Sequence, residues 1–385
     1  MTTLTKSTAL DRRPEGNQWE ALVSNLKSLL DQAEFDLINT HFDAANRRHP
    51  AWSIINAHDL SVHYERQHKD YVTNQAISLI QGEPTGDQWL KNAKKRIVQT
   101  NDFEECASAL AETRCYGALL GCGFEVQPVP TSKLPTPDFE IEINGERGVV
   151  EVATKLEHDE QTKRAEQIAA GATPPGVERS SVQLPNAKMD ITISVVHPFG
   201  EPDPDKKGDT TLTNAISRIC SVKQKESQVI EGRFAILWID FRDLSGWPSM
   251  LELDETVPLT VDNVGILHSG ACWYAFYGWK GAPVLETDYS HSQISTPMAH
   301  FGRFHPGAPK TSRYSAVALS LAEGTVLFEN SKAPTLFGDG VRGALTKLPY
   351  FNLGRSIANW QDGDVDRTNA LSVSMIEAIC KNRGL

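Results

Sequence analysis

An Asn-Gly pair at positions 144 and 145 joins two stretches in which apolar and polar residues alternate. The first stretch is residues 138–143 and the second is residues 148–154. Alternation with a period of two is typical of a strand with one buried face, and Asn-Gly favours the tight turn that connects antiparallel strands. The sequence therefore predicts a β-hairpin, around which the other elements must be arranged.

Helices and strands are expected on both sides of this hairpin. We predict a helix at residues 102–120, capped by Asp102, and a strand at residues 124–129. After an insertion, a helix is expected over residues 211–227. Residues 234–241 are nearly all apolar, which is typical of a central strand covered on both faces. The predicted fold class is α/β (α+β), with a mixed central sheet flanked by helices.

The remaining segments divide the chain into three predicted parts. Residues 1–100 carry apolar residues at helical spacing and are expected to form a helical N-terminal region. Residues 101–245 would form the core, with an insertion at 156–208 that holds a charged helix and a second hairpin. Residues 246–385 are expected to form an α/β extension that adds strands to the core.

The C-terminal part contains a dense aromatic cluster at residues 273–279. Aromatic residues are enriched in strands, so the sequence predicts a strand here whose rings pack in the core or at its rim. Stacking of these rings on nucleobases is the alternative. A hairpin is expected farther on, formed by residues 315–321 and 325–329.

Composition limits the classes of protein that this chain can belong to. Its 385 residues are 40% hydrophobic, which is enough for a large core. No apolar stretch approaches the roughly 18 residues of a membrane-spanning helix, and the N-terminus lacks the apolar run of a signal peptide. The six cysteines are scattered, without zinc-finger spacing. We therefore expect a soluble, cytoplasmic protein with buried, reduced cysteines.

The net charge of −11 weighs against a broad nucleic-acid-binding surface. Affinity for a polyanion comes mainly from Lys and Arg side chains that neutralise phosphates, so any contact with nucleic acid must be local. Three short basic stretches are candidates, although each is explained more readily as a solvated surface. They are Lys91, Lys94, Lys95 and Arg96; Lys206 and Lys207; and Lys223 and Lys225.

A charged residue interrupts the apolar run of the second hairpin strand. Glu151 stands within Val-Val-Glu-Val, where a buried carboxylate needs a partner or a cation. Asp138 opens the first strand, and a period of two places Glu151 on the same face as Ala153 and Lys155. Converging carboxylates are what a hard divalent cation needs in order to bind phosphate oxygens and acidify a water. The hairpin is therefore a candidate metal site.

This segment resembles the PD-(D/E)xK, or restriction-endonuclease-like, nuclease superfamily, whose core runs helix, three strands, helix, strand. Thr136-Pro137-Asp138 resembles the PD element, and Glu151 stands in place of the second acidic residue. Glu112, in the preceding helix, takes the place of the frequent helical acid. The resemblance covers residues 103–155 and extends more weakly to residue 241, about a third of the chain.

One position departs from the superfamily pattern, because Ala153 stands where a lysine normally orients or activates the water. Lys155 is one replacement, on the face of Glu151 and about 7 Å farther along the strand. Lys223 is the other, since the superfamily's lysine is known to migrate to the second helix. Lys223 continues the inward stripe predicted for that helix, which consists of Leu212, Ile216 and Ile219.

The resemblance implies a Mg²⁺-dependent endonuclease, with Mn²⁺ as a substitute, that hydrolyses DNA. RNA is left open as a substrate, and defence against foreign DNA is the setting that the family suggests. The implied catalytic set is Glu112, Asp138 and Glu151, which also bind the metal, with Lys155 or Lys223. The alternative is a catalytically inactive nuclease-fold protein that binds nucleic acid or serves assembly. A homodimer or a partner protein is a further arrangement, since such cores commonly act as dimers.

Overall fold

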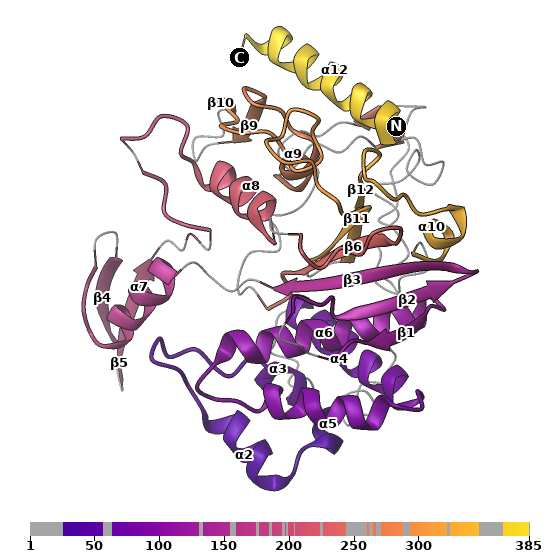
Figure 1. The fold of residues 1–385 in the computed structure, drawn as a ribbon. Coiled ribbons are helices and arrows are strands. Elements are labelled where there is room, and N and C mark those ends of the chain that lie inside the picture. Colours follow the sequence, from indigo (N-terminus) through magenta and orange to yellow (C-terminus); the bar gives the residue numbers. More distant parts are fainter. Residues whose placement is uncertain are drawn as a thin grey trace.

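Most of the chain is described by the computed structural model: residues 26–56, 64–130, 134–154, 159–174, 177–184, 187–194, 197, 199–203, 205–223, 226–243, 260–261, 265–266, 271–287, 293–321, 324–345 and 365–384. These residues form a mixed α/β fold, in which a six-stranded sheet has helices against both faces (Figure 1). The predicted class is therefore confirmed as a mixed central sheet flanked by helices.

The central sheet contains both parallel and antiparallel strands, in the order β1-β2-β3-β6-β11-β12. Strand β6 runs parallel to β3 and to β11, whereas the other neighbours are antiparallel. All seven residues of β6 are buried, as the prediction of a central strand requires. The strands are β1 (Glu125–Pro128), β2 (Phe139–Ile143), β3 (Glu146–Thr154), β6 (Phe234–Asp240), β11 (Ala316–Leu321) and β12 (Gly324–Glu329).

The predicted hairpin is present as β2 and β3. Both turn residues have a positive φ, 52° at Asn144 and 81° at Gly145. This backbone matches the right-handed twist of the flanking strands, and asparagine and glycine adopt it at low cost. The turn sets a register in which Phe139 pairs with Val150. The second predicted hairpin of the sheet is also confirmed, as β11 and β12.

One face of the sheet is covered by α6 (Phe103–Gly121) and by the helices that precede it. Asp102 caps α6 by accepting from the amide of Glu105, as predicted. Gly117 lets α4 approach α6 closely, because a Cβ there would lie 2.3 Å from the Cα of Ala76. The preceding helices are α2 (Gln32–Thr40), α3 (Trp52–Ile55), α4 (Tyr64–Gln81) and α5 (Gly86–Ile97).

The core on the α6 face draws buried residues from all three predicted parts of the chain, between Leu26 and Leu345. The boundaries between those parts stay a prediction. The helical character of the N-terminal region is confirmed for the described residues. Among the described helices, none has the length together with the apolar character that crossing a membrane requires. All six cysteines are buried, as predicted.

The opposite face of the sheet is covered by α8 (Thr211–Ser221) and α9 (Ala271–Tyr277). Figure 1 shows both helices on the side of the sheet away from α6, with α12 (Val365–Arg383) beyond them. Helix α8 begins at Thr210, whose side chain accepts from the amide of Thr213 and forms a capping box with it. The remaining described elements are β7 (Thr260–Val261), β8 (Gly265–Ile266), β9 (Pro283–Thr287), β10 (Gln293–Pro297) and α10 (Asp339–Leu345).

The insertion contains the predicted charged helix and hairpin. These are α7 (Asp159–Ala169), β4 (Val177–Leu184) and β5 (Ala187–Ser194), and the two strands form a sheet of their own. Figure 1 places this unit to one side of the central sheet. Arg179 of β4 donates to the carbonyls of Ile168 and Ala172 at 3.0 and 2.8 Å, which ties the hairpin to the end of α7.

The predicted aromatic strand at residues 273–279 is wrong, because this segment forms helix α9. Every residue from Ala271 to Phe276 is buried, and complete burial suits a helix as well as a central strand. The ring of Phe276 packs against Phe304 and Phe328, with centroid distances of 5.4 and 4.7 Å. Tertiary packing has overridden the strand preference of aromatic residues. The buried rings are not available to stack on nucleobases.

The helix predicted over residues 211–227 is also too long, since α8 ends at Ser221. Val222 has φ −59° and ψ 123°, and Lys223 has φ 49°, so the chain leaves the helix at these residues. Lys223 is therefore not a member of an inward helical stripe, because the apolar residues Leu212, Ile216 and Ile219 lie within α8 and Lys223 lies beyond its end. From this turn, the ammonium of Lys223 reaches the carboxylate of Glu151.

A buried ion pair connects α6 to the carboxyl end of β6. Arg114 donates to Asp240 at 2.8 Å and to Asp243 at 2.5 Å, and all three side chains are at most 1% exposed. Burial alone disfavours the guanidinium charge, but the two carboxylates outweigh it and raise the pKa of Arg114. Because the three charges are buried together, removal of the arginine leaves two buried carboxylates without its compensation.

Arg114→Met is expected to lower the free energy of unfolding by about 3–5 kcal/mol at pH 7, because it leaves two buried carboxylates without their cation. Urea denaturation measures this loss. The matched control is Arg233→Met, which removes the partly exposed Arg233–Glu140 pair of 2.9 Å and is expected to cost less than about 1 kcal/mol. Equal losses in the two variants would contradict the assignment of Arg114 as a buried cross-link.

Candidate metal site

Asp138 and Glu151 lie within electrostatic reach of each other, just before β2 and within β3. The pairing of β2 with β3 ends at Phe139 and Val150, and the amide of Asp138 donates to the carbonyl of the same Val150 at 3.0 Å, as at a β-bulge. Glu151 points to the face under α8, because Val149 and Ala153, which alternate with Glu151, belong to the core there. The predicted face of Glu151 is thus confirmed.

Each of the two carboxylates has one oxygen held by the protein. Oδ2 of Asp138 accepts from the amide of Val152 at 2.7 Å. Oε1 of Glu151 lies 2.8 Å from Nζ of Lys223. Oε2 of Glu151 is buried and has no hydrogen-bond partner among the described residues. A buried acceptor without a partner is costly, so this oxygen is a natural donor atom for a ligand that the protein binds.

Burial and the charges of neighbouring acids raise the pKa of both Asp138 and Glu151. At Asp138, burial is the largest cause, the charges of Glu151 and Glu112 add to it, and the pKa rises to about 7. At Glu151, burial again raises the pKa, although the hydrogen bond and charge of Lys223 oppose the rise. The group therefore carries more negative charge at neutral pH than its surroundings compensate, and a bound cation would relieve this repulsion.

Glu112 lies within electrostatic range of this pair, but an arginine engages its carboxylate. Arg96 of α5 donates to both oxygens of Glu112, at 2.5 and 2.8 Å, and Ser108 donates to Oε1 at 3.3 Å. This two-pronged arrangement is the strong form of an arginine–carboxylate pair. The charge of Glu112 still raises the pKa of Asp138 and Glu151. The structure therefore places Glu112 beside the site with both oxygens already in use.

The donors that remain fit a divalent cation with few protein ligands. Among the described residues, no three His, Cys, Asp or Glu side chains are grouped to hold a metal ion. Mg²⁺ keeps several waters and is commonly held by one or two carboxylates together with substrate phosphate oxygens. The carboxylates of Asp138 and Glu151, with the unpartnered Oε2, supply such a pair. The sequence expectation of three direct carboxylate ligands stays a prediction.

Lys223 approaches Glu151 from the turn after α8, and its side chain is 41% exposed. Lys223 is one of the two lysines that could replace the lysine missing at position 153, and the structure places it beside Glu151. Lys155 lies outside the described residues. The structure places Lys223 beside Glu151 from a turn rather than from a helix face, and its role at the site stays a prediction.

Tyr314 is a neighbour of the site that sequence reasoning missed. It is 1% exposed, and its hydroxyl has no hydrogen-bond partner among the described residues. Burial raises its pKa, and the charge of Glu151 is the next largest cause, which places the phenol within electrostatic reach of the acids. Tyr314 lies just before β11, so the predicted strand at residues 315–321 was the sequence signal nearest to it. No sequence motif indicated that Tyr314 lies near the acids.

The basic stretches that the sequence offered for nucleic-acid contact are partly neutralised. Lys94 pairs with Glu34 at 2.9 Å, and Arg96 pairs with Glu112. Lys206 lies 3.5 Å from Asp209. A basic side chain paired with an acid has less charge to offer to phosphate, so the first stretch is weaker than its composition suggests. Lys225 lies outside the described residues, and contact with DNA stays a prediction.

The fold and this site together define a mixed α/β protein in which a buried glutamate, paired with a lysine, lies within electrostatic reach of a partly buried aspartate at the β2–β3 hairpin. Comparison with models of protein families, with curated proteins and with solved structures found no match.

Asp138→Asn is expected to stabilise the protein at pH 8 and to change its stability little at pH 4. The pKa of about 7 in the folded protein exceeds the ordinary value of 3.8, so the acid favours folding below pH 4 and loses that contribution as the pH rises through 7. Removing the charge should restore as much as about 4 kcal/mol at pH 8. Urea denaturation at both pH values measures the difference.

The control for this prediction is Glu142→Gln, which removes a more exposed carboxylate from the same strand. It should change stability by less than about 1 kcal/mol at either pH. An Asp138→Asn protein whose stability difference from wild type is the same at pH 4 and pH 8 would show that the carboxyl is not held at a raised pKa.

Proposed function

We propose that the protein is a divalent-metal-dependent nuclease that hydrolyses DNA phosphodiester bonds. The observation that carries the proposal is the convergence of Asp138, Glu151 and Lys223 at adjacent positions of the hairpin and the neighbouring turn. The element order supports it, since α6, β1, β2, β3, α8 and β6 occur along the chain as helix, three strands, helix and strand, with the insertion of α7, β4 and β5 between β3 and α8. This is the order of the PD-(D/E)xK core that the sequence resembles.

In this proposal, Asp138 and Glu151 bind Mg²⁺, with Mn²⁺ as a substitute. A cation held there would neutralise charge at the scissile phosphate and acidify a water. The unpartnered Oε2 of Glu151 and the raised pKa of Asp138 support binding, because both describe acids that gain from a positive charge. Glu112 contributes its charge, and it becomes a direct ligand only if Arg96 releases it.

Lys223 supplies the positive charge that the protein itself brings to the reaction. An ammonium has three donors, and one of them is directed at Oε1 of Glu151. The others are available to a water or to a phosphate oxygen, where they would orient the nucleophile and stabilise the negative charge that develops during attack. The partial exposure of Lys223 leaves its ammonium accessible to a substrate.

Metal affinity is expected to rise with pH. A proton on Asp138 competes with the cation, and with a pKa of about 7 most molecules carry that proton at pH 6 and few carry it at pH 8. The affinity for Mn²⁺, measured by calorimetry, should therefore increase about tenfold between these pH values. In Asp138→Asn the affinity should be weak at both, and an unchanged wild-type affinity across this range would contradict the raised pKa.

Cleavage of plasmid DNA in the presence of Mg²⁺ tests the activity itself. Asp138→Asn, Glu151→Gln and Lys223→Met are each expected to lower the rate roughly 100-fold or more, because each removes a charge that acts on the reacting phosphate or water. Glu142→Gln is the control and should cleave like wild type. Full activity in Asp138→Asn would remove the proposal.

The same assay with RNA identifies the nucleic acid that is preferred. If the chain binds Mn²⁺ but cleaves only after cell extract is added, a partner protein completes the enzyme. A rate that rises more steeply than the protein concentration would indicate that a homodimer is the active form.

A second candidate function is favoured by the two basic side chains that already pair with the acids. Arg96 neutralises Glu112, and Lys223 neutralises Glu151, as in a nuclease fold that no longer uses a metal. In that case the protein binds nucleic acid or serves assembly without cleaving. It predicts no measurable Mn²⁺ binding at pH 8, where the nuclease proposal predicts the tightest binding.

A further inference from the structure

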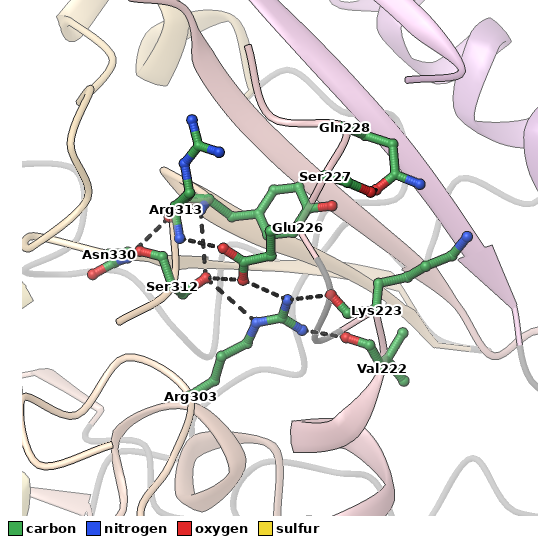
Figure 2. A network of polar contacts seen from close by, with 10 residues as sticks. Val222, Lys223, Glu226, Ser227, Gln228, Arg303, Ser312, Arg313 and Asn330 are labelled. Atoms are coloured by element: carbon green, nitrogen blue, oxygen red, sulfur yellow. Dashed lines mark hydrogen bonds and ion pairs between the residues drawn. The ribbon is translucent and has the colours of Figure 1, made fainter. Parts of the chain in front are cut away.

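A buried arginine from a distant part of the chain holds the turn that carries Lys223. Arg303 is 5% exposed in its side chain, and its backbone amide donates to the carbonyl of Ala275 in α9 at 2.9 Å. Its Nη2 donates to the carbonyl of Lys223 at 2.9 Å, and its Nη1 donates to the carbonyl of Val222. Figure 2 shows the guanidinium between these two carbonyls on one side and Glu226 on the other.

The charge of Arg303 is balanced by an acid that also anchors the approach to β11. Nη2 lies 2.8 Å from Oε1 of Glu226, and Ser312 donates to the same oxygen at 2.6 Å. Oε2 of Glu226 accepts from the amide of Arg313 (Figure 2). The network therefore joins three segments, which are the turn after α8, the segment after α9 and the residues before β11.

The turn needs such support because of the backbone at Lys223. Its φ of 49° is in the left-handed region, which lysine rarely adopts, since its Cβ comes close to the following carbonyl oxygen. A residue persists in this conformation where its surroundings determine it, and such residues cluster at functional sites. Here Arg303 bonds the carbonyl of the strained residue and that of the residue before it.

Arg342, a partly buried arginine, is a useful comparison because, among the described residues, its side-chain hydrogen bonds are not to backbone carbonyls. The side-chain hydrogen bonds of Arg342 go to the carboxylates of Glu329 and Asp339. Arg303 instead divides its donors among the carboxylate of Glu226, the hydroxyl of Ser312 and two backbone carbonyls of the turn. Its guanidinium also lies 5.3 Å from the ring centre of Tyr314, the buried neighbour of the acids.

We propose that Arg303 is a positioning residue, which fixes the left-handed turn at Lys223 so that the lysine ammonium meets Oε1 of Glu151. The effect of Arg303 on catalysis rests on the proposed nuclease function. The effect of Arg303 on the position of Lys223 does not require any activity, because it follows from the contacts of the turn.

The test measures how readily Lys223 reacts in the full-length protein. Reductive methylation followed by mass spectrometry gives the labelling rate of Lys223, with the exposed Lys91 as internal reference. An ammonium held against a carboxylate is shielded from the reagent. Arg303→Gln is expected to raise the Lys223 rate roughly fivefold, the loss expected of a partly exposed ion pair. Glu151→Gln should raise it equally, and the double variant should raise it no further.

Two more variants separate positioning from general loosening of the fold. Arg303→Lys keeps the charge but offers a compact donor in place of the planar fork, so its labelling rate should lie between those of wild type and Arg303→Gln. Arg342→Gln removes the comparison cross-link and should leave the Lys223 rate unchanged. Circular dichroism establishes that each variant is folded, and Arg303→Lys serves as the test if Arg303→Gln does not fold.

Cleavage measured on the same proteins gives the second readout. Arg303→Gln is expected to lower kcat roughly 10- to 100-fold with little change in KM, and Arg303→Lys should recover part of the loss. Faster Lys223 labelling in a chain that neither binds Mn²⁺ nor cleaves DNA would uphold the positioning role and remove the nuclease proposal. Unchanged labelling in folded Arg303 variants, or equal acceleration in Arg342→Gln, would overturn the positioning role.

Discussion

The proximity of Asp138 and Glu151, just before β2 and within β3, is the constraint on which the site depends. The register of the two strands begins at Asn144 and Gly145, whose positive φ angles allow the two-residue turn. A shift of β3 by one residue would turn Glu151 to the opposite face of the sheet, which is filled by the core of α6. The hairpin thus places two negative charges together where water is scarce.

Such a placement costs stability, and the surrounding elements reduce that cost only in part. Lys223 compensates Glu151, and Arg96 compensates Glu112, but the pKa of Asp138 is still raised to about 7. An uncompensated acid is what a cation-binding site needs, since affinity then comes from relief of repulsion already present in the folded protein. Functional sites in proteins commonly lower the stability of the fold in return for activity. Under the proposed function, the raised pKa of Asp138 and the unpartnered Oε2 of Glu151 would both follow from such an exchange.

Features set by neighbouring residues could be predicted from the sequence, and features set by distant contacts could not. The Asn144-Gly145 turn, the Asp102 cap and the apolar strand β6 follow from local chemistry. The end of α8 does not, because no local breaker marks Ser221 and Arg303, far away in the sequence, binds the carbonyls of the turn that follows. Helix α9 could not be predicted, because its residues Ala271–Phe276 are all buried and the sequence therefore shows no helical alternation of apolar and polar residues. The pairing of Arg96 with Glu112 joins two helices and was equally invisible.

The central claim is that the paired carboxylates of Asp138 and Glu151 share a divalent cation. Anomalous X-ray scattering from crystals soaked in Mn²⁺ above pH 7.5 tests it most directly, because the metal is located by its own signal. The account predicts a peak within coordination distance, about 2.0–2.2 Å, of oxygens from both residues. A peak bound elsewhere, or well-ordered acids with no peak between them, would contradict it.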